Sequence, residues 1–249
     1  IDKLALLGKA PQYIQADARN LQELQAAYEH IKRIYPTIHG IIHSAVGAFD
    51  QSLGTVSEAD FRSILSVKID LSVRIAQVFE KEALDFVLFF SSDASFVRGA
   101  GMSGYSAGCS FKDAFALQLA KLWPCVVKVI NWGYWSAGTG ETMSERMKTY
   151  LYGMGYRPID MEEGMKALHA FLASDFNQMS ISRIVQPAFR NFCSNDEWIT
   201  SYIDDSEKTR IQLDLSDIED LSLSSKFENL DNKADKEMED LLCLLLRDI

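Results

Sequence analysis

The chain has few cysteines, scattered histidines and no long apolar run. Its cysteines show neither a CxxC spacing nor matched pairs, which argues against a zinc site or a disulfide framework and predicts a reducing, cytoplasmic setting. These cysteines are Cys109, Cys125, Cys193 and Cys243. The histidines form no ligand-like group either, so no metal site is predicted. No apolar segment approaches the ~18 residues of a membrane span, and no signal peptide is recognisable at the start.

Basic charge is also in short supply. The chain has 25 basic against 35 acidic residues, a formal net charge of -10. Phosphate binding requires clustered lysine and arginine, so this balance argues against a nucleic acid partner and against an anionic membrane surface. The sequence is 47% hydrophobic, which is enough to bury the core of a globular domain.

Apolar strand candidates alternate with amphipathic helices, a pattern that predicts an α/β fold with a parallel sheet. The predicted strands are residues 12–17, 40–45, 85–92, 125–133 and 179–185. Residues 27–35 belong to a predicted helix with helically spaced apolar positions at Leu21, Leu24, Ile31 and Ile34. Further helices are predicted at 58–79 and 104–122. Residues 136–158 contain glycine and methionine and are predicted to form a mobile lid over a substrate cleft.

Three residues together predict a reducing site: Lys68, Ser92 and Tyr105. Ser92 ends an apolar strand, and the carboxyl ends of parallel strands are where open α/β folds bind ligands. Tyr105 opens the next helix. A tyrosine can give its proton to a nascent alkoxide when a lysine ammonium keeps its pKa near about 10 or below, and a serine can bind the same oxygen.

The spacing of these residues resembles that of the ketoreductase domains of modular polyketide synthases, which belong to the short-chain dehydrogenase/reductase superfamily. The serine precedes the tyrosine by thirteen positions, and the lysine precedes the serine by twenty-four. Three motifs extend the resemblance over about residues 10 to 185. They are HGIIHSA at 39–45, YSAGCSFKDAFA at 105–116 and VINWGYW at 129–135. The sequences of these motifs are most similar to those of the trans-acyltransferase branch.

The resemblance implies a Rossmann-like doubly wound parallel sheet that binds NADPH. Such a fold uses a glycine turn and a helix N-terminus to hold the pyrophosphate. The chain has one GxGxxG match, GAGMSG at 99–104, but it belongs to the loop before the helix of Tyr105, and Gly8 belongs to another loop, so neither is that glycine turn. By analogy with the family, the chain starts just before the third strand. We therefore expect the first strands and the glycine turn to lie upstream.

The resemblance also implies residues on the cofactor side. Asp17 matches the aspartate that hydrogen-bonds near the adenine, although a strand-end cap explains it equally well. Ser44 and Ala45 lie in the HGIIHSA motif. Asn131 and Trp132 match residues that position nicotinamide and substrate, with core packing an equal alternative for Trp132.

Cys109 lies one helical turn beyond Tyr105, on the same face. Most family members have asparagine at this position, and classical short-chain dehydrogenases have lysine. Cysteine recurs here in the trans-acyltransferase branch, so Cys109 stays among the candidate catalytic residues as a weak hydrogen-bond partner. A buried structural role is an equal alternative, and no histidine partner for nucleophilic catalysis is evident.

The sequence changes character after about residue 190. Residues 1–190 are predicted to be the catalytic ketoreductase domain, and the acidic, serine-bearing residues 191–233 a solvated linker. Residues 234–249 have a helical stripe of apolar side chains. The resemblance implies that this stripe begins an acyl carrier protein, and an amphipathic helix that docks elsewhere is the alternative.

The predicted function is the NADPH-dependent reduction of the β-keto group of a polyketide bound to an acyl carrier protein through phosphopantetheine. Tyr105 supplies the proton, Ser92 polarises the ketone and Lys68 tunes the tyrosine. Other domains of the synthase are the expected partners. The alternative is a non-reducing structural domain of the same synthase. Retention of all three spaced residues favours the reductase, because a scaffold has no physical need for them.

Overall fold

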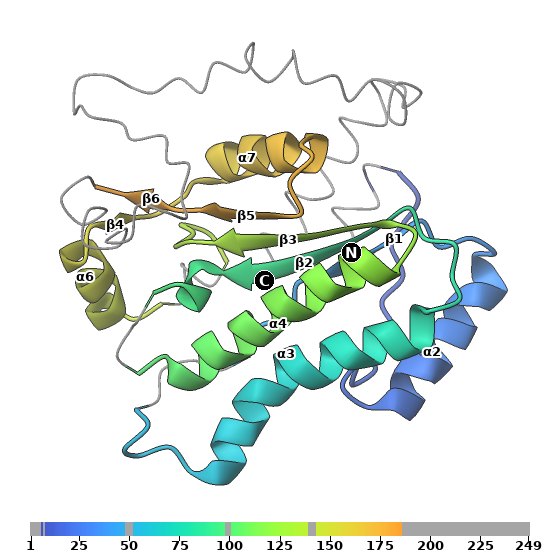
Figure 1. Ribbon diagram of the computed structural model, residues 1–249, viewed down its shortest axis with the longest axis horizontal. Coiled ribbons are helices and arrows are strands. Elements are labelled where there is room, and N and C mark those ends of the chain that lie inside the picture. The colour runs from blue at the N-terminus through green and yellow to red at the C-terminus, as the bar shows by residue number, and fades with distance from the viewer. Residues whose placement is uncertain (1–5, 7, 48–51, 98–100, 139–142, 186–249) are drawn as a thin grey trace. The chain divides into compact units, whose positions relative to one another are not determined.

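The computed structural model describes residues 6, 8–47, 52–97, 101–138 and 143–185 (Figure 1). The predictions for 191–233 and 234–249 therefore lie outside the described residues. The chain divides into two compact units. One is formed by Gln12–Trp132 and Phe176–Ile181, and the other comprises Ile1–Pro11, Gly133–Asp175 and Ser182–Ile249. All candidate catalytic residues belong to the first, which we call the sheet unit.

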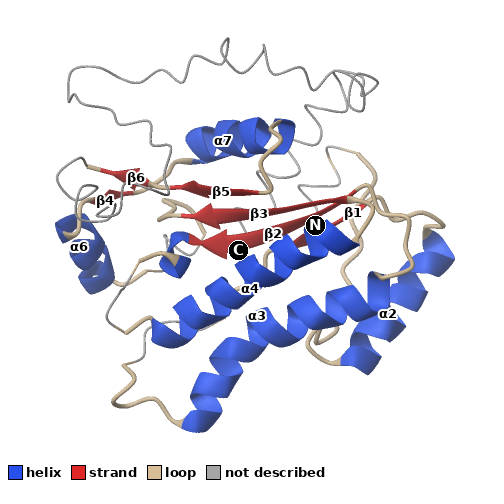
Figure 2. Cartoon of the chain, in the orientation of Figure 1, coloured by secondary structure: helices blue, strands red, loops and turns tan. Residues whose placement is uncertain are grey.

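The sheet unit is built on four strands in the order β1-β2-β3-β5 (Figure 2). These strands are β1 (Gly40–His43), β2 (Phe86–Ser92), β3 (Val126–Trp132) and β5 (Gln178–Ile181). Every neighbouring pair is parallel. The predicted α/β class with a parallel sheet is confirmed, and all carboxyl ends of these strands lie at one edge.

Three helices belong to the same unit: α2 (Leu21–Ile34), α3 (Glu58–Phe79) and α4 (Ser103–Leu122). The Ser57 side chain caps α3 by accepting from the Asp60 main-chain N–H, which explains why this helix begins where the sequence predicts. Helix α4 packs against β2 and β3, and α3 packs against α4 (Figure 1). Two packed helices therefore carry Lys68 and Tyr105.

The core of the sheet unit consists of apolar side chains from the central strands and the inner faces of the helices. Phe89 and Val129 are fully buried, and α3 contributes Leu71 and Ile75. Each such side chain contributes roughly 1.5–3 kcal/mol through burial. This packing fixes the strand ends and helix starts where the candidate site lies.

Two of the predicted strands differ from the structure. Residues 12–17 form no strand within the described parts of the chain, because no described strand pairs with them and an extended segment without ladder hydrogen bonds is not a β-strand. The predicted strand 179–185 is two strands. Its first half belongs to β5, and β6 (Arg183–Ile184) pairs antiparallel with β4 (Tyr156–Arg157) in the other unit.

The second unit also contains α6 (Glu145–Gly153) and α7 (Met161–Ala173). The stretch 136–158 predicted as a lid includes α6 and β4, with 139–142 outside the described residues. The sequence analysis missed α7. Its signal was present, because Asp160 and Glu163 form a reciprocal capping box at its start. Within the described ranges, none of the helices is both long and apolar enough to cross a membrane.

Candidate active site

Ser92 is the last residue of β2, at the carboxyl edge of the parallel sheet. Its Oγ accepts a hydrogen bond from the Ala94 main-chain N–H at 3.2 Å and so caps the short 3-10 helix η1 (Asp93–Ser95). The strand end and the turn that follows it therefore fix the hydroxyl in place. This is the position that the sequence predicts for the serine.

Lys68 and Tyr105 meet across the interface between α3 and α4. The Lys68 side chain is 3% exposed, and its Nζ lies 4.4 Å from the centroid of the Tyr105 ring. An ammonium over an aromatic face is attracted by the ring quadrupole. Lys68 shares the buried face of α3 with Ile64 and Leu71, so its burial follows from helical spacing.

Two glycines of α4 allow this approach. A Cβ at Gly108 would lie 2.9 Å from Lys68 Cδ, and one at Gly104 would lie 3.2 Å from the Phe61 ring. Both distances are shorter than ordinary van der Waals contact. The glycines therefore form a groove in which α3 comes close enough for Lys68 to reach Tyr105.

The pKa of Tyr105 is raised above its ordinary value. Desolvation is the largest cause, the nearby Cys109 sulfur adds to it, and a hydrogen bond with the Ser92 side chain opposes it. This differs from the expectation that Lys68 keeps the pKa near or below about 10, because burial of the phenol raises it. Tyr105 consequently holds its proton at neutral pH, as a proton donor must.

Cys109 is fully buried on α4. Burial raises the pKa of its thiol, and the nearby Lys68 and Lys112 act in the opposite direction. A thiol that resists ionisation is a poor nucleophile. The arrangement fits both alternatives from the sequence, a weak hydrogen-bond partner beside Tyr105 and a buried structural residue.

Asn131 is 0% exposed, and its amide is occupied by protein partners. Its Nδ2 donates to Asp113 Oδ2 at 2.7 Å, to the Ser92 main-chain oxygen at 3.0 Å and to Ser95 Oγ at 3.3 Å. Its Oδ1 accepts from Gln178 Nε2 at 2.9 Å. Asn131 thus supports the strand end that carries Ser92, and its role in positioning nicotinamide and substrate stays a prediction.

The other predicted cofactor residues occupy different settings. Trp132 is 6% exposed and lies edge-to-face on Phe90, with ring centroids 5.9 Å apart, which favours its core-packing alternative. Ser44 and Ala45 follow β1 at the carboxyl edge and are partly buried. Ala45 packs against the core of the sheet unit.

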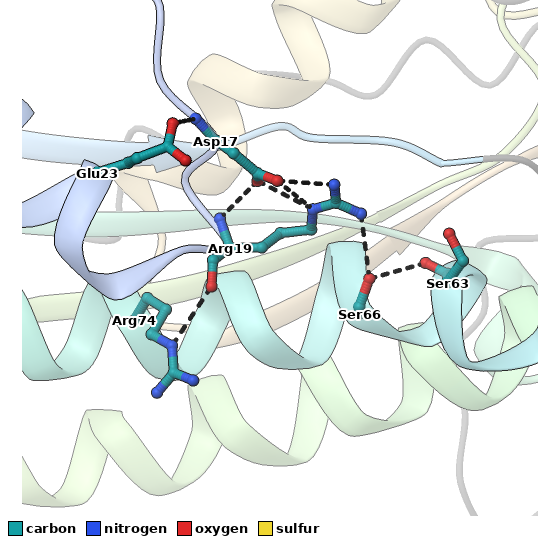
Figure 3. Close-up of polar contacts among 6 residues, drawn as sticks. All are labelled: Asp17, Arg19, Glu23, Ser63, Ser66 and Arg74. Atoms are coloured by element: carbon teal, nitrogen blue, oxygen red, sulfur yellow. Dashed lines mark hydrogen bonds and ion pairs between the residues drawn. The ribbon is translucent and has the colours of Figure 1, made fainter. Parts of the chain in front are cut away.

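Asp17 participates in a surface network that joins the turn before α2 to α3 (Figure 3). Its carboxylate accepts from Arg19 Nη2 at 2.7 Å and Nε at 2.9 Å, and Arg19 Nη1 donates to Ser66 Oγ at 3.3 Å. The Asp17 main-chain N–H donates to Glu23 Oε2 at 2.8 Å. The hydrogen bonds from Arg19 lower the pKa of Asp17 to about 2. The Asp17 carboxylate is thus paired with Arg19, and it is Asn20 rather than Asp17 that caps α2.

The sequence analysis missed three buried polar residues at the site: His43, Lys112 and Asp113. His43 ends β1, and burial together with Lys112 and Lys68 lowers its imidazole pKa well below the ordinary value. Lys112 and Asp113 lie within the FKDAFA motif, two helical turns beyond Tyr105. That spacing was a usable signal, but lysine and aspartate are ordinarily expected in solvent.

The parallel sheet, with Lys68, Ser92 and Tyr105 gathered at its carboxyl edge, is the arrangement expected of a short-chain dehydrogenase/reductase. Comparison with known families narrows the class, since the KR domain family matches residues 1–137. The chain belongs to this family, the ketoreductase domains of polyketide synthases, as the sequence analysis predicted. A ketone-reducing, oxidoreductase role follows from that membership.

Known proteins agree with this assignment. The chain is 46% identical to polyketide synthase PksN of Bacillus subtilis over 81% of its own length, and 40% identical to PksM over 99%. It spans only 4% and 6% of those proteins. A solved ketoreductase domain from the bacillaene assembly line is 28% identical, with a TM-score of 0.66 over 72% of this chain and 44% of that one.

Proposed function

We propose that this chain carries the catalytic residues of an NADPH-dependent β-ketoacyl reductase. Its substrate is a polyketide intermediate bound to an acyl carrier protein through phosphopantetheine, and its product is the β-hydroxy thioester. The observation that carries the proposal is the meeting of Lys68, Ser92 and Tyr105 at one edge of the sheet. The other domains of a polyketide synthase are the proposed partners, and the cytoplasm is the proposed location.

The three side chains perform complementary steps. The Ser92 hydroxyl donates a hydrogen bond to the ketone oxygen and polarises the carbonyl. Tyr105, which keeps its proton because its pKa is raised, passes that proton to the same oxygen as it becomes an alkoxide. Lys68 then stabilises the phenolate left behind, since its Nζ lies against the ring.

The three side chains fit a reaction that uses a nicotinamide cofactor. A phenol, a hydroxyl and an ammonium supply a proton and hydrogen bonds but no electron pair for the carbonyl carbon, so the reduction needs a separate hydride donor. NADPH supplies that hydride when it is bound. Ser44 and Ala45, small side chains after β1 at the same edge, are the proposed neighbours of the cofactor. Residues 1–190 are the proposed catalytic domain.

A direct assay tests the proposed function. We expect the natural protein that contains this sequence to oxidise NADPH when given a β-ketoacyl thioester and to form an equal amount of β-hydroxy thioester, measured by absorbance and mass spectrometry. The β-hydroxy thioester offered in place of the ketone serves as the control. A protein that binds the thioester but consumes no NADPH supports the alternative of a non-reducing structural domain.

Replacing Lys68 with alanine is expected to lower the rate and to move the alkaline limb of the pH–rate profile upward. An ammonium near Tyr105 favours the phenolate, so its removal raises the pKa of the phenol, and Tyr105 then loses its proton at a higher pH. The measurement is kcat against pH with saturating NADPH. Lys128→Ala, which removes another buried lysine, is the control. A uniform loss without a shifted limb would assign Lys68 a purely positional role.

A further inference from the structure

Two consecutive buried residues of α4 connect the helix of Tyr105 to β2, the strand that ends at Ser92, and to its neighbour β3. Lys112 donates from Nζ to the Phe90 main-chain oxygen at 2.8 Å, two residues before Ser92 on β2. Asp113 Oδ2 accepts from Asn131 on β3 at 2.7 Å, and Asn131 donates to the Ser92 main-chain oxygen at 3.0 Å. Both connections therefore end on the same strand terminus.

Lys112 is 0% exposed, which is unusual for a lysine and costs free energy. Its pKa is well below the ordinary value, because burial and the neighbouring Lys68 both disfavour a second buried ammonium. Cys109 and Asp113 from its own helix act in the opposite direction, and His43 of β1 also lies within its electrostatic reach. A fully buried lysine does not contribute to solubility, so another role must offset the cost of its burial.

We propose that Lys112 is a positioning residue of the reducing site: through the Phe90 carbonyl it holds the end of β2, and with it the Ser92 hydroxyl, in place against Tyr105. The inference rests on the proposed function, which gives Ser92 and Tyr105 their roles. Lys112 follows Tyr105 by seven positions, two helical turns on the same side of α4. A misplacement of ~1 Å at a reacting group can cost on the order of 10²-fold in rate.

The chain contains a matched control for this role. Lys128 on β3 is also buried, at 6% exposure, and its Nζ also donates to a main-chain oxygen at 2.8 Å, that of Phe176. Phe176 precedes β5, so this hydrogen bond lies toward the amino end of the parallel sheet, away from Ser92. Lys112→Met and Lys128→Met each remove the N–H donors and leave an apolar side chain of similar length.

In the natural protein that contains this sequence, we expect both variants to lower the melting temperature by a similar few degrees. Only Lys112→Met should lower kcat, by about 10- to 100-fold, with the KM for NADPH unchanged. Equal kcat values for the two variants overturn the proposal. If Lys112→Met does not fold, Lys112→Gln and Lys128→Gln replace the pair, and the same unequal effect on kcat is expected.

Two further measurements separate this inference from the proposed function. In a Ser92→Ala background, Lys112→Met should cause no additional loss of rate, and a full additional loss shows that Lys112 does not act through Ser92. Amide hydrogen exchange of residues 90–92 should be faster in Lys112→Met than in Lys128→Met, and equal exchange overturns the proposal. A wild-type protein that reduces no thioester refutes the proposed function, and the exchange measurement then decides the role of Lys112 alone.

Discussion

Replacing Tyr105 with phenylalanine is expected to lower kcat for reduction of a β-ketoacyl thioester by about 10²–10⁴-fold, the typical contribution of a positioned proton donor. The ring remains, so its packing and the contact of Lys68 with its face remain as well. NADPH affinity and the melting temperature should therefore stay close to those of the wild type. Steady-state kinetics with the intact protein, together with a fluorescence titration of NADPH, provides the measurement.

Tyr28→Phe is the matched control for that experiment. Tyr28 also donates from its hydroxyl to a side chain, that of Glu82, and its ring packs edge-to-face on Phe79, but it lies on α2. The same chemical change at this position should leave kcat unaltered. If Tyr105→Phe retains the full rate, Tyr105 has no part in the mechanism and the proton must come from elsewhere.

Residues 1–249 alone are expected to bind NADPH weakly and to show no measurable reduction. Most dinucleotide affinity comes from a glycine turn and the helix N-terminus behind it, and the one GxGxxG in this sequence, at 99–104, belongs instead to the loop before the helix of Tyr105. A titration followed by NADPH fluorescence, with and without a segment that carries that turn, is the measurement. Added covalently or as a separate chain, the segment should restore both binding and reduction.

Tight NADPH binding by residues 1–249 without any added segment would contradict this expectation and would show that the predicted place of the glycine turn is wrong. The same preparation should also tend to associate. Among the described strands β1 is at the edge of the sheet, and Ile42 on it is exposed. An unpaired strand edge is a template for pairing with another chain.

The elements that could be predicted from the sequence are those determined by local signals. Helix α3 has the predicted bounds, since Ser57 supplies a recognisable cap and the apolar residues keep helical spacing. The segment 12–17 contains Tyr13, Ile14 and Ala16 but forms no strand, because a strand depends on a partner that its own residues do not specify. The break between β5 and β6 likewise depends on two different partners.

The candidate site likewise has residues that could be predicted from the sequence and contacts that could not. Lys68, Ser92 and Tyr105 could be found from their spacing, and the structure brings them together. The hydrogen bonds that Asn131 and Lys112 donate to main-chain oxygens of β2 could not be predicted, because both side chains can donate to many acceptors. Which carbonyl lies within reach depends on how the helix packs on the sheet, and no residue type encodes that.

Because of the glycine groove on α4, the proposed reduction depends on how α3 and α4 are aligned along each other. Gly104 and Gly108 lie one turn apart, and α3 presents Phe61 and Lys68 to them. A rotation or slip of one helix along the other would move the ammonium away from the phenol while every strand stayed paired. Substitutions in the glycine groove can therefore alter turnover although the substituted residues contact neither ketone nor cofactor. The rate of catalysis could be changed there independently of substrate choice.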